Sequence, residues 1–314
     1  MHPHRVKRGA RHLHRVARIV LQEAAAISSL LFGSVTSGQT MPAGAAVPVT
    51  YSQNYDPSLS PDGARMVFLK ALEGREQLFI ANADGSNERR LLAPAGVDIE
   101  DPAWSPDGRL IAYIRIAGTS KAMHVMNVDG SADRVLTPPN QSPIHPAWMP
   151  DSASILYCTD DDLHPPQKNA AEIYRIDVAS RKIATLISGG VNTYPVPSPD
   201  GTRIAFRKMV DTNSEVFIAN IDGTGVRNLT NHPAFDGWPA WSPDGRRIAF
   251  ASNRNSAYQV FVMDADGSNV KLVANTEGRA TAPQWSKDGR FIYFTNSWRT
   301  GLRGAAEIFR APAP

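Results

Sequence analysis

The sequence predicts an all-β protein: a six-bladed β-propeller whose blades are four-stranded antiparallel sheets. Three observations predict this fold. The pattern Pro-x-(Trp or apolar)-Ser-Pro-Asp-Gly, followed by a short apolar strand, returns six times, with substitutions in two of the copies. The aspartates of the copies are spaced 45, 44, 49, 44 and 44 residues apart. The 23 Gly and 24 Pro residues gather at recurring places, which indicates many turns.

Each repeat begins with an inner strand that carries Pro-x-Trp and ends in the turn Ser-Pro-Asp-Gly. In this turn Pro presets φ, Asp bonds back to the backbone and Gly takes the left-handed conformation. A second and a third strand follow, and an Asp-Gly turn leads into a fourth strand in most repeats. The second strands are expected at 66–68, 111–113, 155–157, 204–206, 248–250 and 292–294, and the third strands at 78–80, 124–126, 173–175, 216–218, 260–262 and 308–310.

The last repeat ends just after its third strand, so its fourth strand has to come from elsewhere. Residues 46–51 (AVPVTY) precede the first repeat and are unused by it. We expect them to pair as the outer strand of the last blade and close the ring, because an open ring would leave unpaired strand edges.

The two predicted regions of the chain are a leader, residues 1–40, and the propeller, residues 41–314. A basic stretch in the leader precedes an apolar run over 24–35 and then small residues suited to cleavage. This run is too short for a membrane-spanning helix, so we expect no stable membrane insertion once the leader is removed. The protein is therefore expected to be periplasmic or secreted; if translation starts at Met41, it is cytoplasmic.

The charge of the chain lies mostly in that leader. The net charge is +3, but residues 1–37 hold six cations and one anion, which leaves 27 cations and 29 anions in the remainder. A mildly acidic body disfavours a nucleic-acid partner. Cys158 is the single cysteine of the sequence, so an internal disulfide and a thiolate-rich metal cluster are excluded.

The repeat, with Ile-Ala-Phe and Asp-Gly-Ser after Pro-x-Trp-Ser-Pro-Asp-Gly, resembles the propeller repeat of TolB, the periplasmic component of the Tol-Pal system. It is also similar to the repeats of prolyl-oligopeptidase-type peptidases and tricorn protease. TolB carries an α/β domain before its propeller, whereas about 50 residues precede the first repeat here. The peptidases carry a hydrolase domain, and the sequence has no Gly-x-Ser-x-Gly nucleophile motif. The resemblance thus implies a stand-alone TolB-like propeller.

The topology also predicts where a site would form. The loops between second and third strands, and the connections between blades, share one face of the ring, called face X below. The residue before the first Pro of each repeat is expected at the X end of an inner strand, at the mouth of the central channel. Reading around the ring, these residues are Asp56, Asp101, His145, Tyr194, Trp238 and Ala282.

Two interpretations of this channel mouth are open. In the first, the polar and aromatic rim binds a peptide or small ligand, and Asp56, Asp101 and His145 could hold a divalent cation. In the second, it is a solvated opening whose residues serve packing. We expect no metal, because hard cations need more oxygen ligands than these.

Two long loops on face X add candidates, since variable loops on a rigid scaffold usually carry binding sites. The loop of the third repeat contributes Asp160, Asp161 and His164, and the loop of the sixth contributes Trp298. An acidic run in a surface loop is more often solvated than metal-binding.

The leading hypothesis is an exported, non-catalytic module that binds a protein or peptide partner through face X, without cofactor or catalytic residues and as a monomer. The alternative is a propeller enzyme, a hydrolase, lactonase or lyase, with a metal at the channel mouth. A third hypothesis is an accessory part of a cell-envelope assembly.

Overall fold

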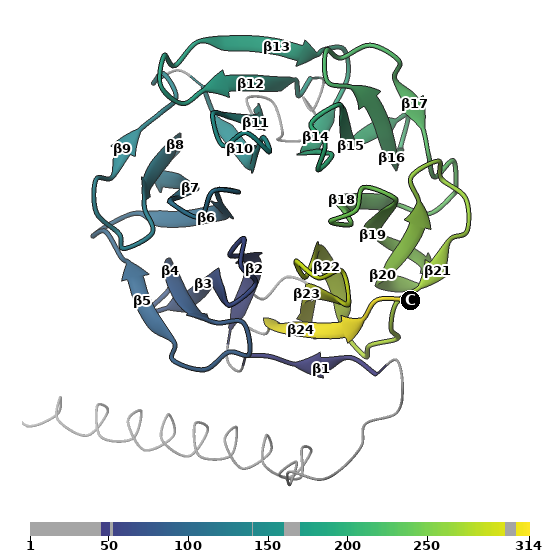
Figure 1. Cartoon of the computed structure of the whole chain (residues 1–314), viewed down its shortest axis with the longest axis horizontal. Coiled ribbons are helices and arrows are strands. Elements are labelled where there is room, and N and C mark those ends of the chain that lie inside the picture. The colour runs from purple at the N-terminus through teal and green to yellow at the C-terminus, as the bar shows by residue number, and fades with distance from the viewer. Residues whose placement is uncertain (1–44, 51–52, 140, 160–169, 299–305) are drawn as a thin grey trace, which may run out of the picture. The chain divides into compact units, whose positions relative to one another are not determined.

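The computed structural model describes residues 45–50, 53–139, 141–159, 170–298 and 306–314, and the predicted leader lies outside them. In this part of the chain, strands form six four-stranded antiparallel sheets around a central channel, as predicted (Figure 1). Each sheet is one blade, and blades one to six follow the chain order. No helix long and apolar enough to cross a membrane occurs in the ranges just given.

The first three blades have their strands in simple chain order from the channel outward. Blade one holds β2 (Asn54–Leu59), β3 (Arg65–Leu72), β4 (Arg75–Asn82) and β5 (Arg89–Leu92). Blade two holds β6 (Asp98–Trp104), β7 (Leu110–Ala117), β8 (Ser120–Asn127) and β9 (Arg134–Val135). Blade three holds β10 (Pro143–Trp148), β11 (Ser154–Thr159), β12 (Ile173–Asp177) and β13 (Ile183–Ile187).

Blades four and five repeat this order, and blade six takes its outer strand from the other end of the chain. Blade four holds β14 (Asn192–Pro197), β15 (Arg203–Val210), β16 (Asn213–Asn220) and β17 (Arg227–Asn228). Blade five holds β18 (Asp236–Trp241), β19 (Arg247–Asn255), β20 (Ala257–Asp264) and β21 (Lys271–Leu272). Blade six holds β22 (Arg279–Trp285), β23 (Phe291–Ser297), β24 (Ala306–Pro312) and β1 (Val47–Pro48).

The ring is closed by β1, which pairs antiparallel with β24. The contact continues past the strand, since the Val49 amide donates to the Ile308 carbonyl at 2.7 Å and the Ile308 amide donates to Thr50 Oγ1 at 3.2 Å. Gly85 lets this segment approach blade one: a Cβ there would lie 2.0 Å from the Val49 carbonyl oxygen. The predicted closure of the ring by an N-terminal strand is confirmed for residues 47–50, and residue 51 of the predicted segment lies outside the described residues.

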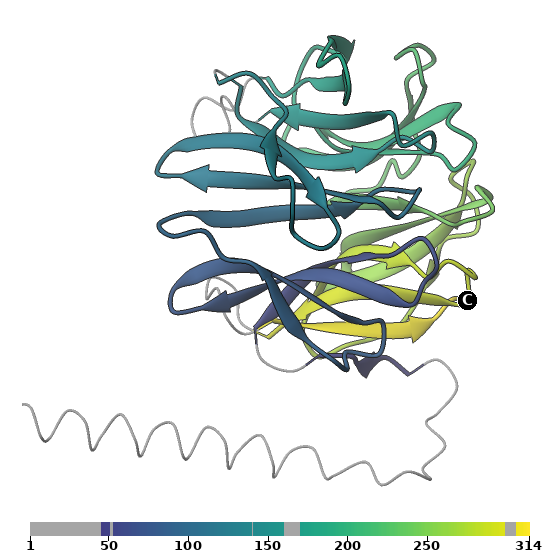
Figure 2. The same ribbon diagram turned by 60° about the vertical axis from the view of Figure 1, so that its left-hand side comes forward.

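The blades lie face to face around the ring (Figure 2). The core lies between them, because buried apolar residues of neighbouring blades pack in common clusters. The recurring tryptophans belong to this core and are 6–7% exposed. Trp148, Trp241 and Trp285 also donate from Nε1 to a backbone carbonyl of the preceding blade, at 3.0, 3.2 and 3.1 Å. The sequence repeat therefore produces the same indole-to-carbonyl hydrogen bond at three of the contacts between neighbouring blades.

The Ser-Pro-Asp-Gly turns have the structure that their residues predict. In blade four, Ser198 Oγ donates to Asp200 Oδ1 at 2.5 Å, and the Thr202 amide donates to the same oxygen at 3.0 Å. These hydrogen bonds lower the pKa of Asp200 to about 2. Gly201 has φ +71°, the left-handed value expected at this position. These turns act as scaffold on the face opposite X.

Candidate functional site

The channel residues sit at a β-bulge that recurs in all six blades. In each pair of inner and second strands the register shifts at the residue before the first Pro, as between Tyr55 and Ser58. All six residues have φ between 50° and 53°, the left-handed region that non-glycine residues rarely adopt. The prediction that they stand at the strand end was wrong. They lie inside the strand, because the bulge inserts an extra residue there.

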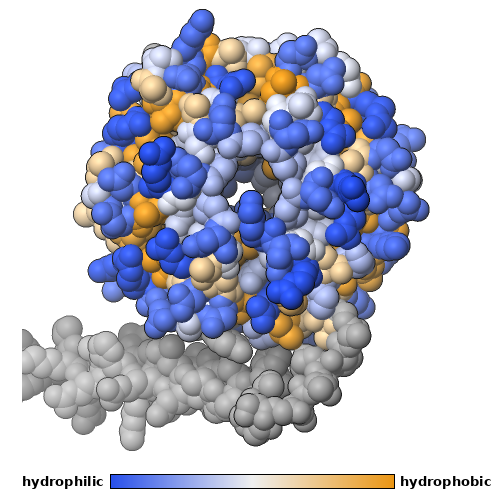
Figure 3. All heavy atoms as spheres, in the orientation of Figure 1, coloured by the Kyte–Doolittle hydropathy of each residue, from blue (hydrophilic) through white to orange (hydrophobic). Residues whose placement is uncertain are grey.

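The bulges bring the predicted side chains together. Asp56, Asp101, His145, Tyr194 and Trp238 line one cavity of about 210 Å³ in the channel, together with Ala282 and the prolines that follow each of them. All six are half-buried. The space-filling view shows the open centre of the ring, surrounded mainly by hydrophilic residues (Figure 3).

One side of this channel is acidic. The Asp101 carboxylate accepts a hydrogen bond from the His145 amide at 2.8 Å, and the Asp56 amide donates to Thr295 Oγ1 at 3.0 Å. Burial, together with the neighbouring charges of Asp101, Glu76 and Glu100, raises the pKa of Asp56 to about 8. Asp56 is therefore mostly protonated at neutral pH and can donate a hydrogen bond to a ligand.

The other side is a row of aromatic rings in contact, of which His145 and Tyr194 are stacked and Trp238 and Tyr258 meet edge-on. The centroids of His145 and Tyr194 are 3.6 Å apart, those of Tyr194 and Trp238 5.2 Å, and those of Trp238 and Tyr258 5.6 Å. The guanidinium of Arg207 lies 5.0 Å from the Tyr194 ring. Burial raises the pKa of Tyr194, so its hydroxyl stays neutral. Such rigid rings offer a large contact area to a ligand at little entropic cost.

Beneath this row lies Cys158, whose Sγ is 3.4 Å from His145 Nδ1. The thiol is fully buried, which confirms the interpretation of Cys158 as a small core residue. Its contact with His145 follows from the register of blade three, in which Cys158 pairs with Ile144.

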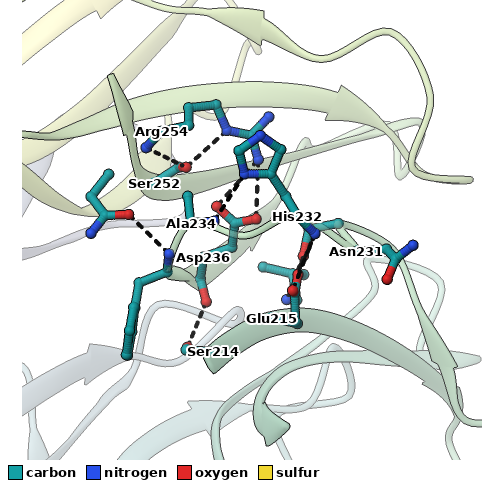
Figure 4. Close-up of polar contacts among 12 residues, drawn as sticks. Ser214, Glu215, Asn231, His232, Ala234, Asp236, Ser252 and Arg254 are labelled. Carbon is teal, nitrogen blue, oxygen red and sulfur yellow. Dashed lines mark hydrogen bonds and ion pairs between the residues drawn. The ribbon is translucent and has the colours of Figure 1, made fainter. Parts of the chain in front are cut away.

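A buried polar network holds the segment before Trp238 (Figure 4). Arg254 Nη2 donates to both carboxylate oxygens of Asp236, at 3.0 and 3.2 Å, and Arg254 Nε donates to Ser252 Oγ at 2.8 Å. Ser214 Oγ donates to the Asp236 carbonyl at 2.8 Å and so joins blade four to blade five. Because the Asp236 side chain is fully buried, this network fixes the strand that carries Trp238.

Of the residues predicted on the two long loops, only Trp298 lies in the described part of the chain. Asp160, Asp161 and His164 lie outside the described residues, so their part in a site stays a prediction. Trp298 is 40% exposed and lies edge-on against Phe309 of β24, with centroids 5.7 Å apart. It is not among the residues that line the channel cavity.

The side chains of Asp56, Asp101 and His145 are not arranged as a metal-binding group in the described residues. Within the described ranges, no group of three or more His, Cys, Asp or Glu side chains is arranged to hold a metal ion.

The fold and its channel define a six-bladed propeller of the TolB type. The family model described as the TolB beta propeller domain matches residues 37–164 and 111–307, and the chain belongs to this family. The predicted resemblance is confirmed. No curated protein sequence matches the chain.

Solved structures agree on the fold. A putative TolB from Agrobacterium tumefaciens is 23% identical, with a TM-score of 0.64 over 84% of this chain and 91% of that one. TolB from Acinetobacter baumannii is 22% identical, with a TM-score of 0.64 over 83% of this chain and 63% of that one. An oligogalacturonate lyase from Vibrio parahaemolyticus is 12% identical, with a TM-score of 0.56 over 87% and 92%. These identities establish the fold alone.

Proposed function

We propose that this protein is an exported, non-catalytic propeller that binds a protein or peptide partner through the channel on face X. The observation that carries the proposal is the recurring bulge, which aims six side chains into one cavity at the cost of left-handed backbone strain. Strained backbone that recurs at a cavity is typical of a functional site. The TolB family membership is consistent with a binding propeller.

The chemistry of the cavity favours binding over catalysis. Cys158 and His145 are a thiol and an imidazole in contact, but the thiol has no exposed surface for a substrate to reach. Asp101 accepts from a backbone amide, and Tyr194 is neutral and stacked. These groups suit hydrogen bonding and ring contacts with a peptide.

The test is affinity capture from a periplasmic extract of the source cells, with the tagged full chain as bait. The site variant replaces Asp56, Asp101, Tyr194 and Trp238 by Ala. A matched control replaces four exposed residues by Ala on the turns opposite face X: Asp62, Asp84, Lys287 and Arg246. Partner recovery with wild type and control, and its loss with the site variant, supports the proposal, provided that all three unfold at similar temperatures. Equal recovery by all three contradicts it.

The alternative of a propeller enzyme rests on the neighbouring Asp56, Asp101 and His145. One solved structure of similar fold, 14% identical with a TM-score of 0.55, is an oligogalacturonate lyase in complex with manganese. Elemental analysis of protein purified from its own cells tests this alternative, since stoichiometric metal that EDTA removes would favour it. The N-terminal sequence of the same sample tests the proposed export.

A further inference from the structure

Arg279 is the first residue of the inner strand of blade six, and its guanidinium is held by two aromatic rings of blade five. Its Cζ lies 4.4 Å from the centroid of Tyr258 and 5.9 Å from that of Trp238. The Nε atom is buried and has no hydrogen-bond partner. No ion pair or hydrogen bond of this side chain is found in the described ranges, so a cation is fixed in place with its hydrogen-bonding capacity unused. A buried donor without a partner costs free energy. The Nη1 and Nη2 atoms of Arg279 are not among the buried, unpartnered atoms of the described residues, so they are the donors that a ligand can reach.

Arg207 places a second guanidinium on the same aromatic row. It lies over Tyr194, and its Nε donates to Thr193 Oγ1 at 2.8 Å. The stem of Arg207 packs on Gly237, where a Cβ would lie 3.0 Å from Arg207 Cδ. Like Arg279, Arg207 forms no ion pair with a carboxylate in the described part of the chain.

The carboxylates around Asp56 come from blades one and two. Asp56 and Glu76 belong to blade one, Asp101 and Glu100 to blade two, and Glu100 pairs with Lys121 at 3.5 Å. The two guanidiniums belong to blades four and six and lie on the aromatic row. Glu100 is paired with Lys121 and Asp236 of blade five with Arg254, whereas Arg207 and Arg279 are half-buried and form no ion pair in the described residues. The two guanidiniums lie behind Tyr194 and Trp238, which line the cavity, and their charge is left for an anionic group of a ligand.

We propose that Arg279 binds a carboxylate of the partner, with a neighbouring apolar or aromatic group of the partner against Trp238 and with Arg207 adding positive charge on the same row. This inference rests on the proposed function and names the chemistry that the partner presents. A planar guanidinium matches a carboxylate with two parallel hydrogen bonds, and the contact with Tyr258 restricts the movement of the Arg279 guanidinium. The carboxylate is either a chain terminus or an Asp or Glu side chain.

The test is a titration of the ¹⁵N-labelled full chain, followed through the arginine Nε–Hε signals. Three acetylated probes are used: Gly-Phe-Ala with a free C-terminus, the same peptide amidated, and amidated Gly-Asp-Phe. We expect a saturable shift of the Arg279 signal with the first or the third probe, which identifies the source of the carboxylate, and none with the second. No shift with any probe, or an equal shift with the amidated Gly-Phe-Ala, overturns the proposal.

Variants of Arg279 test whether its guanidinium binds the carboxylate of the probe. Arg279→Gln should weaken binding of the active probe about tenfold or more, since charge-assisted hydrogen bonds are lost. Arg279→Lys should recover only part of the affinity, because the bidentate geometry is absent. The control Arg246→Gln, at an exposed position on a turn opposite face X, should bind like wild type. Undiminished affinity of Arg279→Gln overturns the proposal.

The two proposals fail separately. If the partner is captured by wild type and by Arg279→Gln but not by the four-alanine channel variant, the binding function stands and the role of Arg279 is wrong. If wild type captures no partner, the binding function is wrong, whatever the probes show.

Discussion

His145 and Tyr194 stack face to face with their ring centroids 3.6 Å apart, although they belong to different blades. The pair joins blade three to blade four at the channel, in addition to the main-chain hydrogen bond that the Asn192 amide of β14 donates to the Ala171 carbonyl at 2.8 Å. Cys158 touches the imidazole from one side and the guanidinium of Arg207 lies over the tyrosine ring. Ring stacking therefore contributes to the seam between blades as well as to the cavity wall.

Replacing Tyr194 by Ala should lower the free energy of unfolding by a few kcal/mol, because a large half-buried ring and its stacking are lost. Tyr194→Phe keeps the stack and should cost less than about 1 kcal/mol. Urea unfolding followed by circular dichroism measures both. Equal losses for the two variants would show that the hydroxyl, not the stack, matters.

The free energy of unfolding should depend on pH through the titration of Asp56. The pKa of Asp56 is raised from 3.8 to about 8 in the folded chain. Between these values the folded state binds one proton more than the unfolded state, so this group lowers the free energy of unfolding as pH rises through the window. The melting temperature of wild type should thus fall relative to that of Asp56→Asn between about pH 5 and pH 8. Parallel curves would contradict the prediction.

Backbone strain at the bulge should be measurable at Ala282, the one small residue of the six. It has φ +50°, and its Cβ makes this conformation unfavourable by roughly 1–2 kcal/mol. Ala282→Gly should raise the free energy of unfolding by up to about 1 kcal/mol, since glycine entropy offsets part of the relief. The control Ala240→Gly, in an inner strand without positive φ, should lower it. Denaturant unfolding measures the free energy of unfolding of both variants. If both are less stable than wild type, the prediction of backbone strain at Ala282 is wrong.

Closure of the ring should depend on Gly85. Gly85→Ala puts a Cβ 2.0 Å from the Val49 carbonyl oxygen, so the segment around β1 has to move. Gly74→Ala is the matched control, since Gly74 has φ +76° but no atom within 4 Å of the added Cβ. Hydrogen exchange should show faster exchange of the Val49 and Ile308 amides in Gly85→Ala only. Unchanged exchange in both variants would show that the closing strand adapts.

The sequence allowed the fold to be predicted because its turn residues are periodic. Pro, Asp and Gly at fixed offsets define the hairpins, and the apolar triplets between them define the buried strands, as at Ile111 and Ile248, which are fully buried. The closing strand could be predicted because the sixth repeat ends after its third strand and residues 46–51 are left over by the first repeat. The bulge was not predicted, since its left-handed residue is of five different types in the six repeats and none of them is glycine.

The channel residues before the prolines could be predicted from topology, whereas Arg207, Tyr258 and Arg279 were missed. Arg207 follows Ile-Ala-Phe in a second strand, at the place where Cys158 and Thr295 stand in other repeats. The available signal was that a charged residue replaces an apolar or small one at a repeated core position. Tyr258 and Arg279 carry no such motif, and their contact depends on how two blades pack.

The pairing of β1 with β24 constrains the order of folding. The Ile308 amide and the Thr50 hydroxyl that it contacts are 258 positions apart. Loop-closure entropy has to be overcome across this separation before the contact forms, and contacts of such sequence separation form slowly. The strands of blades one to five, by contrast, follow one another in the sequence. Blade six is therefore expected to gain its outer strand after the other five blades have formed.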